Sequence, residues 1–216
     1  MDNQRRLKAL DLFCCAGGAS MGLSNAGFEV TGVDIKPQPL YPFKFHLADA
    51  MTFPLEGYDF IWASPPCQGY SHLTPEGSKK NHEKLISLLR KQLIDRGIPY
   101  CIENVAGAKK ELINPVMLCG SMFGLRTQRH RFFETSFVFQ APQNCDHSEL
   151  PLLVTTASKA SREKRFKLGI KPKTVKNASL AYGIGWMNFA GLKEAIPPAY
   201  AEYIGVRFMG SKNDFP

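Results

Sequence analysis

Long apolar runs are missing from this sequence. Although 44% of its 216 residues are hydrophobic, no stretch reaches the roughly 18 apolar residues that a membrane-spanning helix needs. Residues 1–6 also lack the apolar segment of a secretory signal peptide. These absences argue against a membrane partner and against secretion, and we expect a cytoplasmic protein.

Disulfide spacing and internal repeats are missing as well. The six cysteines fall mostly within or beside apolar runs, without the spacing of a disulfide framework, and we expect reduced thiols. The cluster Cys145-Asp146-His147 suggests metal binding, but tetrahedral zinc needs two further ligands, and none stands at a recognisable spacing. We therefore predict no metal site, while the question of whether Cys145 and His147 bind a metal stays open.

Charge is plentiful and mostly positive. The net charge is +8 and the sequence pI is about 9.2, which suits a polyanionic partner such as a nucleic acid. The basic residues are densest in one block, residues 159–176. Such a block is equally consistent with a solvated surface segment, so the charge alone does not decide between the two.

An α/β fold is indicated by the alternation of strand and helix patterns from residue 7 to residue 105. Short apolar runs predict buried strands, while apolar residues at helical spacing predict helices. This alternation is typical of a mostly parallel sheet with helices on both faces. The expected strands are 7–13, 28–34, 46–50, 58–63 and 98–102, and the expected helices are 20–26 and 85–97.

The pattern changes beyond residue 120. Residues 131–139 are rich in aromatic side chains and predict a strand that is exposed on one face. Residues 140–178 are polar and basic with poor periodicity, which predicts a short basic insert. Residues 192–209 predict a terminal helix with two prolines near its first turn. We expect a single domain over residues 1–216.

The most informative segment is the turn Ser64-Pro65-Pro66-Cys67-Gln68. It follows the predicted strand 58–63, and its two consecutive prolines fix the direction of the chain because their φ angles are locked. The turn therefore presents a thiol at the carboxyl end of a buried strand, where open α/β sheets bind their ligands. A buried structural cysteine would show the same short pattern, so the other motifs decide.

This turn resembles the nucleophile loop of the DNA cytosine-C5 methyltransferases. Four further segments resemble elements of the same family and stand in the family's order, which leaves little room for chance. They are the glycine turn at residues 11–22, Glu103-Asn104-Val105, Arg129-His130-Arg131, and residues 194–200. The resemblance covers residues 7–140 and 180–209. It implies a Rossmann-like methyltransferase fold with S-adenosylmethionine as cofactor.

The resemblance also assigns the cofactor pocket. The glycine turn would let the cofactor approach the backbone closely, with Cys15 standing where the family usually has its first glycine. Asp34 would accept hydrogen bonds from ribose hydroxyls, and Asp49 would face the adenine amino group. The implied cofactor-binding residues are Phe13, Gly17, Gly18, Asp34, Ile35, Asp49 and Pro66.

The chemistry that the resemblance implies is methyl transfer to cytosine. Cys67 would add to C6 while Glu103 hydrogen-bonds or protonates N3, after which C5 takes the methyl group and loses its proton. The target base would be flipped out of the duplex, because its reacting atoms are shielded there. A guanidinium from Arg129 or Arg131 would lie beside the base carbonyl and favour the thiolate of Cys67. Glu194 replaces an asparagine of the family.

The space for target recognition is small. The family carries a sizeable recognition domain before its last element, but here only residues 140–178 are available. We expect a short, phage-like member of the family that acts as a monomer on a short or degenerate DNA target, with room for a protein partner in recognition.

Two other hypotheses about the function stay open. The same chemistry could act on RNA, single-stranded DNA or a free cytosine nucleotide. The chain could also be a catalytically idle DNA-binding module, although the intact Cys67 and Glu103 argue against that.

Overall fold

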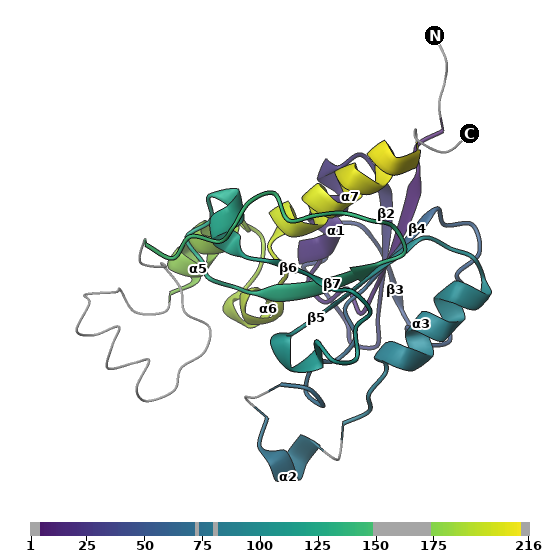
Figure 1. Cartoon of the computed structure of the whole chain (residues 1–216), viewed down its shortest axis with the longest axis horizontal. Helices are drawn as coiled ribbons and strands as arrows, with labels where there is room; N and C mark the ends of the chain where they lie inside the picture. Colours follow the sequence, from purple (N-terminus) through teal and green to yellow (C-terminus); the bar gives the residue numbers. More distant parts are fainter. Residues whose placement is uncertain (1–4, 72–73, 80–81, 149–173, 213–216) are drawn as a thin grey trace.

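A seven-stranded sheet organises the chain in a computed structural model (Figure 1). The structure describes residues 5–71, 74–79, 82–148 and 174–212. The strand order is β3-β2-β1-β4-β5-β7-β6, in which β1 to β5 run parallel and β7 is antiparallel to both of its neighbours. The strands are β1 (Lys8–Leu12), β2 (Glu29–Asp34), β3 (Lys44–Leu47), β4 (Phe60–Ala63), β5 (Tyr100–Asn104), β6 (Val116–Leu118) and β7 (Arg131–Thr135).

Two apolar cores lie on opposite faces of this sheet. Alternate side chains of β4 show the division, because Phe60 and Trp62 pack into one core while Ile61 and Ala63 pack into the other. All of these side chains are fully buried, and each large one contributes about 1.5–3 kcal/mol by leaving water. Helices α1 (Gly18–Asn25) and α7 (Pro198–Lys212) cover the first core, and α3 (Ile86–Asp95) covers the second (Figure 1).

A smaller cluster joins the carboxyl-terminal part of the chain to the glycine turn. Helices α5 (Val175–Tyr182) and α6 (Phe189–Glu194) pack around Ala16, and the Trp186 indole donates a hydrogen bond to the Ala16 carbonyl at 3.0 Å. Short helical turns complete the chain at α2 (Glu76–Lys79), η1 (Ala106–Ala108) and η2 (Gly120–Phe123). Within the described ranges, no helix is long and apolar enough to cross a bilayer.

The predicted α/β class is confirmed, and the five strands predicted before residue 105 all form and run parallel. The third strand is Lys44–Leu47, so it ends before Asp49 and not at residue 50. Strand β7 ends at Thr135 and not at residue 139. The edge strand β6 was not predicted, because three residues carry too little pattern to show a period.

The single terminal helix predicted over residues 192–209 is wrong. The chain forms two helices there, and Ala195 adopts a non-helical backbone with ψ 142° between them. Pro197 and Pro198 keep the two helices apart, because Ile196 and Pro197 each precede a proline and are pushed out of the helical region. Helix α5 also begins inside the predicted insert 140–178, where the Thr174 side chain accepts a hydrogen bond from the Asn177 amide. Residues 149–173 of that insert lie outside the described residues.

Candidate active site

A cavity of about 540 Å³ opens at the carboxyl ends of the parallel strands. Its walls come from the segments that follow β1, β2, β4 and β5, from the residues around the start of β7, and from the link between α6 and α7. This edge is where doubly wound sheets bind ligands, since loops diverge there and leave a crevice. The predicted catalytic residues all line the cavity, namely Cys67, Glu103, Arg129 and Arg131.

The predicted cofactor residues divide into two groups. Five of them line the same cavity, namely Phe13, Gly18, Asp34, Ile35 and Pro66. Gly17 and Asp49 lie outside its lining. Gly17 caps α1 and packs against the Tyr41 ring, while Asp49 is exposed and accepts a hydrogen bond from the Met51 amide at 2.9 Å. A direct cofactor contact of Asp49 stays a prediction.

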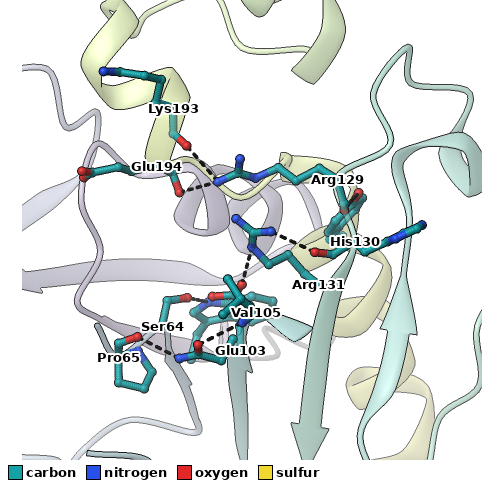
Figure 2. Close-up of polar contacts among 12 residues, drawn as sticks. Ser64, Pro65, Glu103, Val105, Arg129, His130, Arg131, Lys193 and Glu194 are labelled. Carbon is teal, nitrogen blue, oxygen red and sulfur yellow. Dashed lines mark hydrogen bonds and ion pairs between the residues drawn. The ribbon is translucent and has the colours of Figure 1, made fainter. Parts of the chain in front are cut away.

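Hydrogen bonds hold the Pro-Pro-Cys turn in place. The Asn104 side chain donates to the Pro65 carbonyl at 2.9 Å and accepts from the Val105 amide at 2.9 Å (Figure 2). On the far side of the turn, the Cys67 carbonyl accepts from the amides of Tyr70 and Ser71 at 3.0 and 2.8 Å. These bonds, with the locked prolines, fix where the Cys67 thiol enters the cavity.

Glu103 and Arg131 form a buried ion pair at the wall of the cavity. The Nε–Oε1 distance is 2.9 Å, and the Arg131 guanidinium also donates to the His130 carbonyl at 2.8 Å (Figure 2). Burial raises the pKa of the Glu103 carboxyl above its ordinary value, and the charges of Arg131 and Arg129 only partly oppose that rise. A carboxyl group tuned in this way can hold and deliver a proton.

The Cys67 thiol lies within electrostatic reach of the same pair. Burial raises its pKa above the ordinary value, and the Glu103 carboxylate raises it further. Arg131 and Arg129 lower the pKa of Cys67, as expected from the sequence, but their effect is the smaller one. The prediction that a guanidinium favours the thiolate therefore agrees with the effect of both arginines, although burial and Glu103 keep the pKa of Cys67 above its ordinary value.

The hydrogen-bond partners of the Arg129 guanidinium are groups of the protein. Its guanidinium donates to the carbonyls of Lys193 and Glu194 at 3.0 and 3.2 Å (Figure 2). It also donates to the Tyr182 hydroxyl at 3.3 Å. The Arg129 carbonyl in turn accepts from the Tyr200 hydroxyl at 2.7 Å. Arg129 thus ties α6 and α7 to the residues that precede β7, which is a positioning role.

The glycine turn contains residues with left-handed backbone geometry. Phe13, Cys15 and Gly17 have φ of 61°, 45° and 84°. A residue with a Cβ atom is strained in the left-handed region of backbone conformation. Cys15 therefore occupies a position that glycine would suit better. The Cys15 amide donates to the Asp34 carboxylate at 2.9 Å, which holds the turn against the end of β2.

Asp11 is a cavity residue that the sequence patterns did not single out. It is 1% exposed; one carboxylate oxygen accepts from the Ser20 hydroxyl, and Oδ1 has no hydrogen-bond partner among the described residues. Burial raises the pKa of Asp11 to about 7. An acidic residue inside an apolar strand was the available signal, because carboxylates are rarely buried without a function or a partner.

The fold and the site define a class of protein. A mostly parallel sheet in this order, with its cavity at the strand ends, is the Rossmann-like fold of the S-adenosylmethionine-dependent methyltransferases. Residues 7–111 match the family model described as C-5 cytosine-specific DNA methylase. The predicted family is confirmed by this match over residues 7–111.

One solved structure agrees with this chain at the level of the fold. The Dnmt2 methyltransferase of S. pombe has a TM-score of 0.59 and 13% identity, over 95% of this chain and 99% of that chain. A prophage-encoded E. coli protein described as a DNA modification methyltransferase has a TM-score of 0.45 and 22% identity, over 59% of this chain and 45% of that one. Spodoptera frugiperda DNMT2 has a TM-score of 0.47 and 15% identity, over 67% and 57%.

The chain therefore spans about half the length of the prophage and Spodoptera proteins. No curated protein matches the sequence. Identities this low show the fold alone, and the phage-like character and the reduced recognition region stay predictions.

Proposed function

We propose that the chain transfers a methyl group from S-adenosylmethionine to C5 of cytosine in DNA. The observation that carries this proposal is the meeting of Cys67 with the Glu103–Arg131 pair in one cavity at the carboxyl edge of the sheet. A nucleophile, a proton donor and a cation are the groups that addition to a cytosine ring requires.

The cavity has the features that S-adenosylmethionine would need. The cofactor carries positive charge and ribose hydroxyls, and the wall offers the buried carboxylates of Asp11 and Asp34. The unpartnered oxygen of Asp11 is an acceptor that a bound cation or donor would satisfy. The amino terminus of α1 adds a favourable end for the cofactor's carboxylate. When bound, the cofactor supplies an electrophilic methyl group.

Cys67 and Glu103 have different roles in the proposed reaction. The Cys67 thiol gives up its proton, and its sulfur forms a bond to C6 of the cytosine. Glu103, whose pKa is raised by burial, donates a proton or hydrogen bond to N3 and takes up the charge that develops in the ring. C5 then bonds to the methyl group, and loss of the C5 proton breaks the Cys67–C6 bond and restores the ring.

DNA is the proposed acceptor because of the family match and the net charge of +8. The test supplies labelled S-adenosylmethionine in parallel reactions with duplex DNA, single-stranded DNA, RNA and deoxycytidine nucleotides. We expect label in duplex DNA and none with Cys67→Ser, whose hydroxyl is a far poorer nucleophile. Label in free nucleotide or RNA but not in DNA would contradict the DNA assignment, and no label in any acceptor would contradict methyl transfer itself.

A further inference from the structure

Four metal-ligating side chains converge beside the cavity. Cys119, His130, Cys145 and His147 each offer one ligand atom, and these atoms all lie within 4.8 Å of one another. The Cys119 sulfur is 3.3 Å from Nε2 of His147, and Nε2 of His130 is 3.2 Å from that same nitrogen. Proposed methyl transfer uses none of these side chains.

The four ligands come from segments that are distant in the sequence. Cys119 directly follows β6, His130 directly precedes β7, and Cys145 and His147 stand on the segment after β7. The antiparallel pairing of β6 with β7 brings the first two together. No metal site was predicted from the sequence, because Cys119 and His130 stand far from Cys145 and His147 along the chain.

Hydrogen bonds between the same segments support the cluster. The Ser121 hydroxyl donates to the Cys119 sulfur at 3.3 Å and accepts from the Asp146 amide at 3.1 Å. The Gln143 side chain donates to the Met122 carbonyl at 3.0 Å. Metal sites are built in this way, because donors around a thiolate orient it and stabilise its charge.

We infer that Cys119, His130, Cys145 and His147 bind one structural zinc ion. In a tetrahedral Cys2His2 site, Zn–S bonds of about 2.3 Å and Zn–N bonds of about 2.0–2.1 Å separate neighbouring ligand atoms by roughly 3.3–3.8 Å. The two contacts of 3.3 and 3.2 Å already fall close to this range. Four protein ligands fill the coordination sphere, which is typical of a structural and not a catalytic zinc site.

The charges balance in such a site. Both cysteines lose their protons and bind as thiolates, and both histidines bind as neutral imidazoles through Nε2. The two thiolate charges then neutralise Zn²⁺. Binding should therefore release the two thiol protons to the buffer.

The position of His130 gives the zinc a consequence for the cavity. His130 stands between Arg129 and Arg131, and all three line the cavity wall. Zinc bound to His130 would fix the backbone that carries both arginines and would hold residues 145–147 against β6 and β7. The inference does not depend on methyl transfer, because its test measures metal.

The test uses the whole chain without a histidine tag, produced in zinc-supplemented medium and purified under reducing conditions without chelator. Elemental analysis should find about one zinc per chain. Exchange with Co²⁺ should give the visible absorption of tetrahedral cobalt together with thiolate-to-cobalt charge transfer. A folded wild-type protein that holds no zinc and shows no such spectrum would overturn the inference, and so would a Cys119–Cys145 disulfide found in the protein as purified.

Matched variants locate the site. His147→Asn and Cys145→Ser should each weaken zinc retention in chelator competition by at least about tenfold, as loss of one tetrahedral ligand requires. The controls His46→Asn and Cys67→Ser, which alter a histidine and a cysteine outside the cluster, should keep the wild-type zinc content. Unchanged retention in both cluster variants would overturn the assignment of ligands.

Discussion

At the residue scale, the proposed chemistry depends on how neighbouring charges set the proton affinities of Cys67 and Glu103. Both groups have a pKa above the ordinary value, chiefly because burial disfavours their charged forms. The raised pKa favours the protonated thiol of Cys67.

Replacing Glu103 should separate these two effects. The Glu103 carboxylate raises the pKa of Cys67, so Glu103→Gln should lower it and shift thiol alkylation at Cys67 to lower pH. The same change should reduce methylation by about 10²–10⁴-fold, the usual contribution of a general acid. Alkylation is followed across pH by mass spectrometry of the Cys67 peptide.

The control for this experiment is Glu111→Gln, which removes a carboxylate that does not line the cavity. It should leave the alkylation profile unchanged. A profile for Glu103→Gln that stays in place or moves to higher pH would contradict the electrostatic account.

Cys15 offers a second test at this scale. Its φ of 45° strains a residue that has a Cβ, and a β-branched side chain strains it more. Cys15→Val should therefore lower the free energy of unfolding by about 1–2 kcal/mol, while Cys15→Gly should leave it unchanged or raise it. Denaturant unfolding of both variants measures this. Equal losses in the two variants would show that packing, and not backbone strain, governs the position.

Sequence patterns brought the proposed catalytic residues to one place because they lie in short motifs beside strands, and their catalytic roles stay predictions. Cys67, Glu103, Arg129 and Arg131 all reach one cavity. Asp11 was missed because only the structure shows that one of its buried carboxylate oxygens has no hydrogen-bond partner among the described residues. The histidine and cysteine cluster was missed because strand pairing, and not spacing in the sequence, brings its members together.

At the element scale, the close approach of α1 to the start of α7 shapes one wall of the cavity. A Cβ at Gly18 would lie 2.3 Å from the Ile196 carbonyl oxygen, and one at Gly22 would lie 2.1 Å from that of Pro198. The link between α6 and α7 can reach the cavity because α1 has glycine at both points of contact.

Gly22→Ala should destabilise the fold because the added methyl group meets backbone that cannot move freely. We expect a loss of about 2 kcal/mol or more in the free energy of unfolding, typical of overpacking. Gly210→Ala is the control, since α7 has open space there and alanine favours helix by about 0.5–1 kcal/mol. Thermal and denaturant unfolding measure both. A stabilised Gly22→Ala variant would contradict the packing of α1 against α7.

The positions of helices and strands were predictable where the periodicity of apolar residues was strong. The predictions failed where tertiary contacts decide where an element begins or ends. Strands β1, β2, β4 and β5 are mostly buried and were found near their predicted bounds, whereas the half-exposed β3 was predicted two residues late. The break between α6 and α7 depends on the backbone restriction that Pro197 and Pro198 impose, which an apolar pattern over residues 192–209 does not report. Strand β6 exists through its pairing with β7 alone.

At the scale of the whole molecule, the net charge of +8 predicts a polyanionic partner. The densest basic block, residues 159–176, lies mostly outside the described residues, and its role in binding phosphates stays a prediction. The monomeric state and a protein partner for target recognition also stay predictions.

Charge removal tests this block. Changing Lys159, Lys164 and Lys171 to glutamine should weaken DNA binding about equally on all sequences and reduce the slope of affinity against salt by about 0.9 for each lost phosphate contact. The control is the double variant Lys44→Gln with Lys91→Gln, which should change neither the affinity for DNA nor its dependence on salt. Binding is measured by fluorescence anisotropy at several salt concentrations. A loss confined to one sequence would mean that the block reads bases.

The most direct test of the central claim is covalent trapping on DNA that contains 5-fluorocytosine, in the presence of S-adenosylmethionine. After methyl transfer, the fluorine on C5 cannot leave as a proton would, so the bond between the enzyme and C6 should persist. The account predicts an adduct that survives denaturation and maps by mass spectrometry to Cys67, and that is absent from Cys67→Ser. An adduct at another residue, or labelled methyl in ordinary DNA with no trapped adduct, would contradict it.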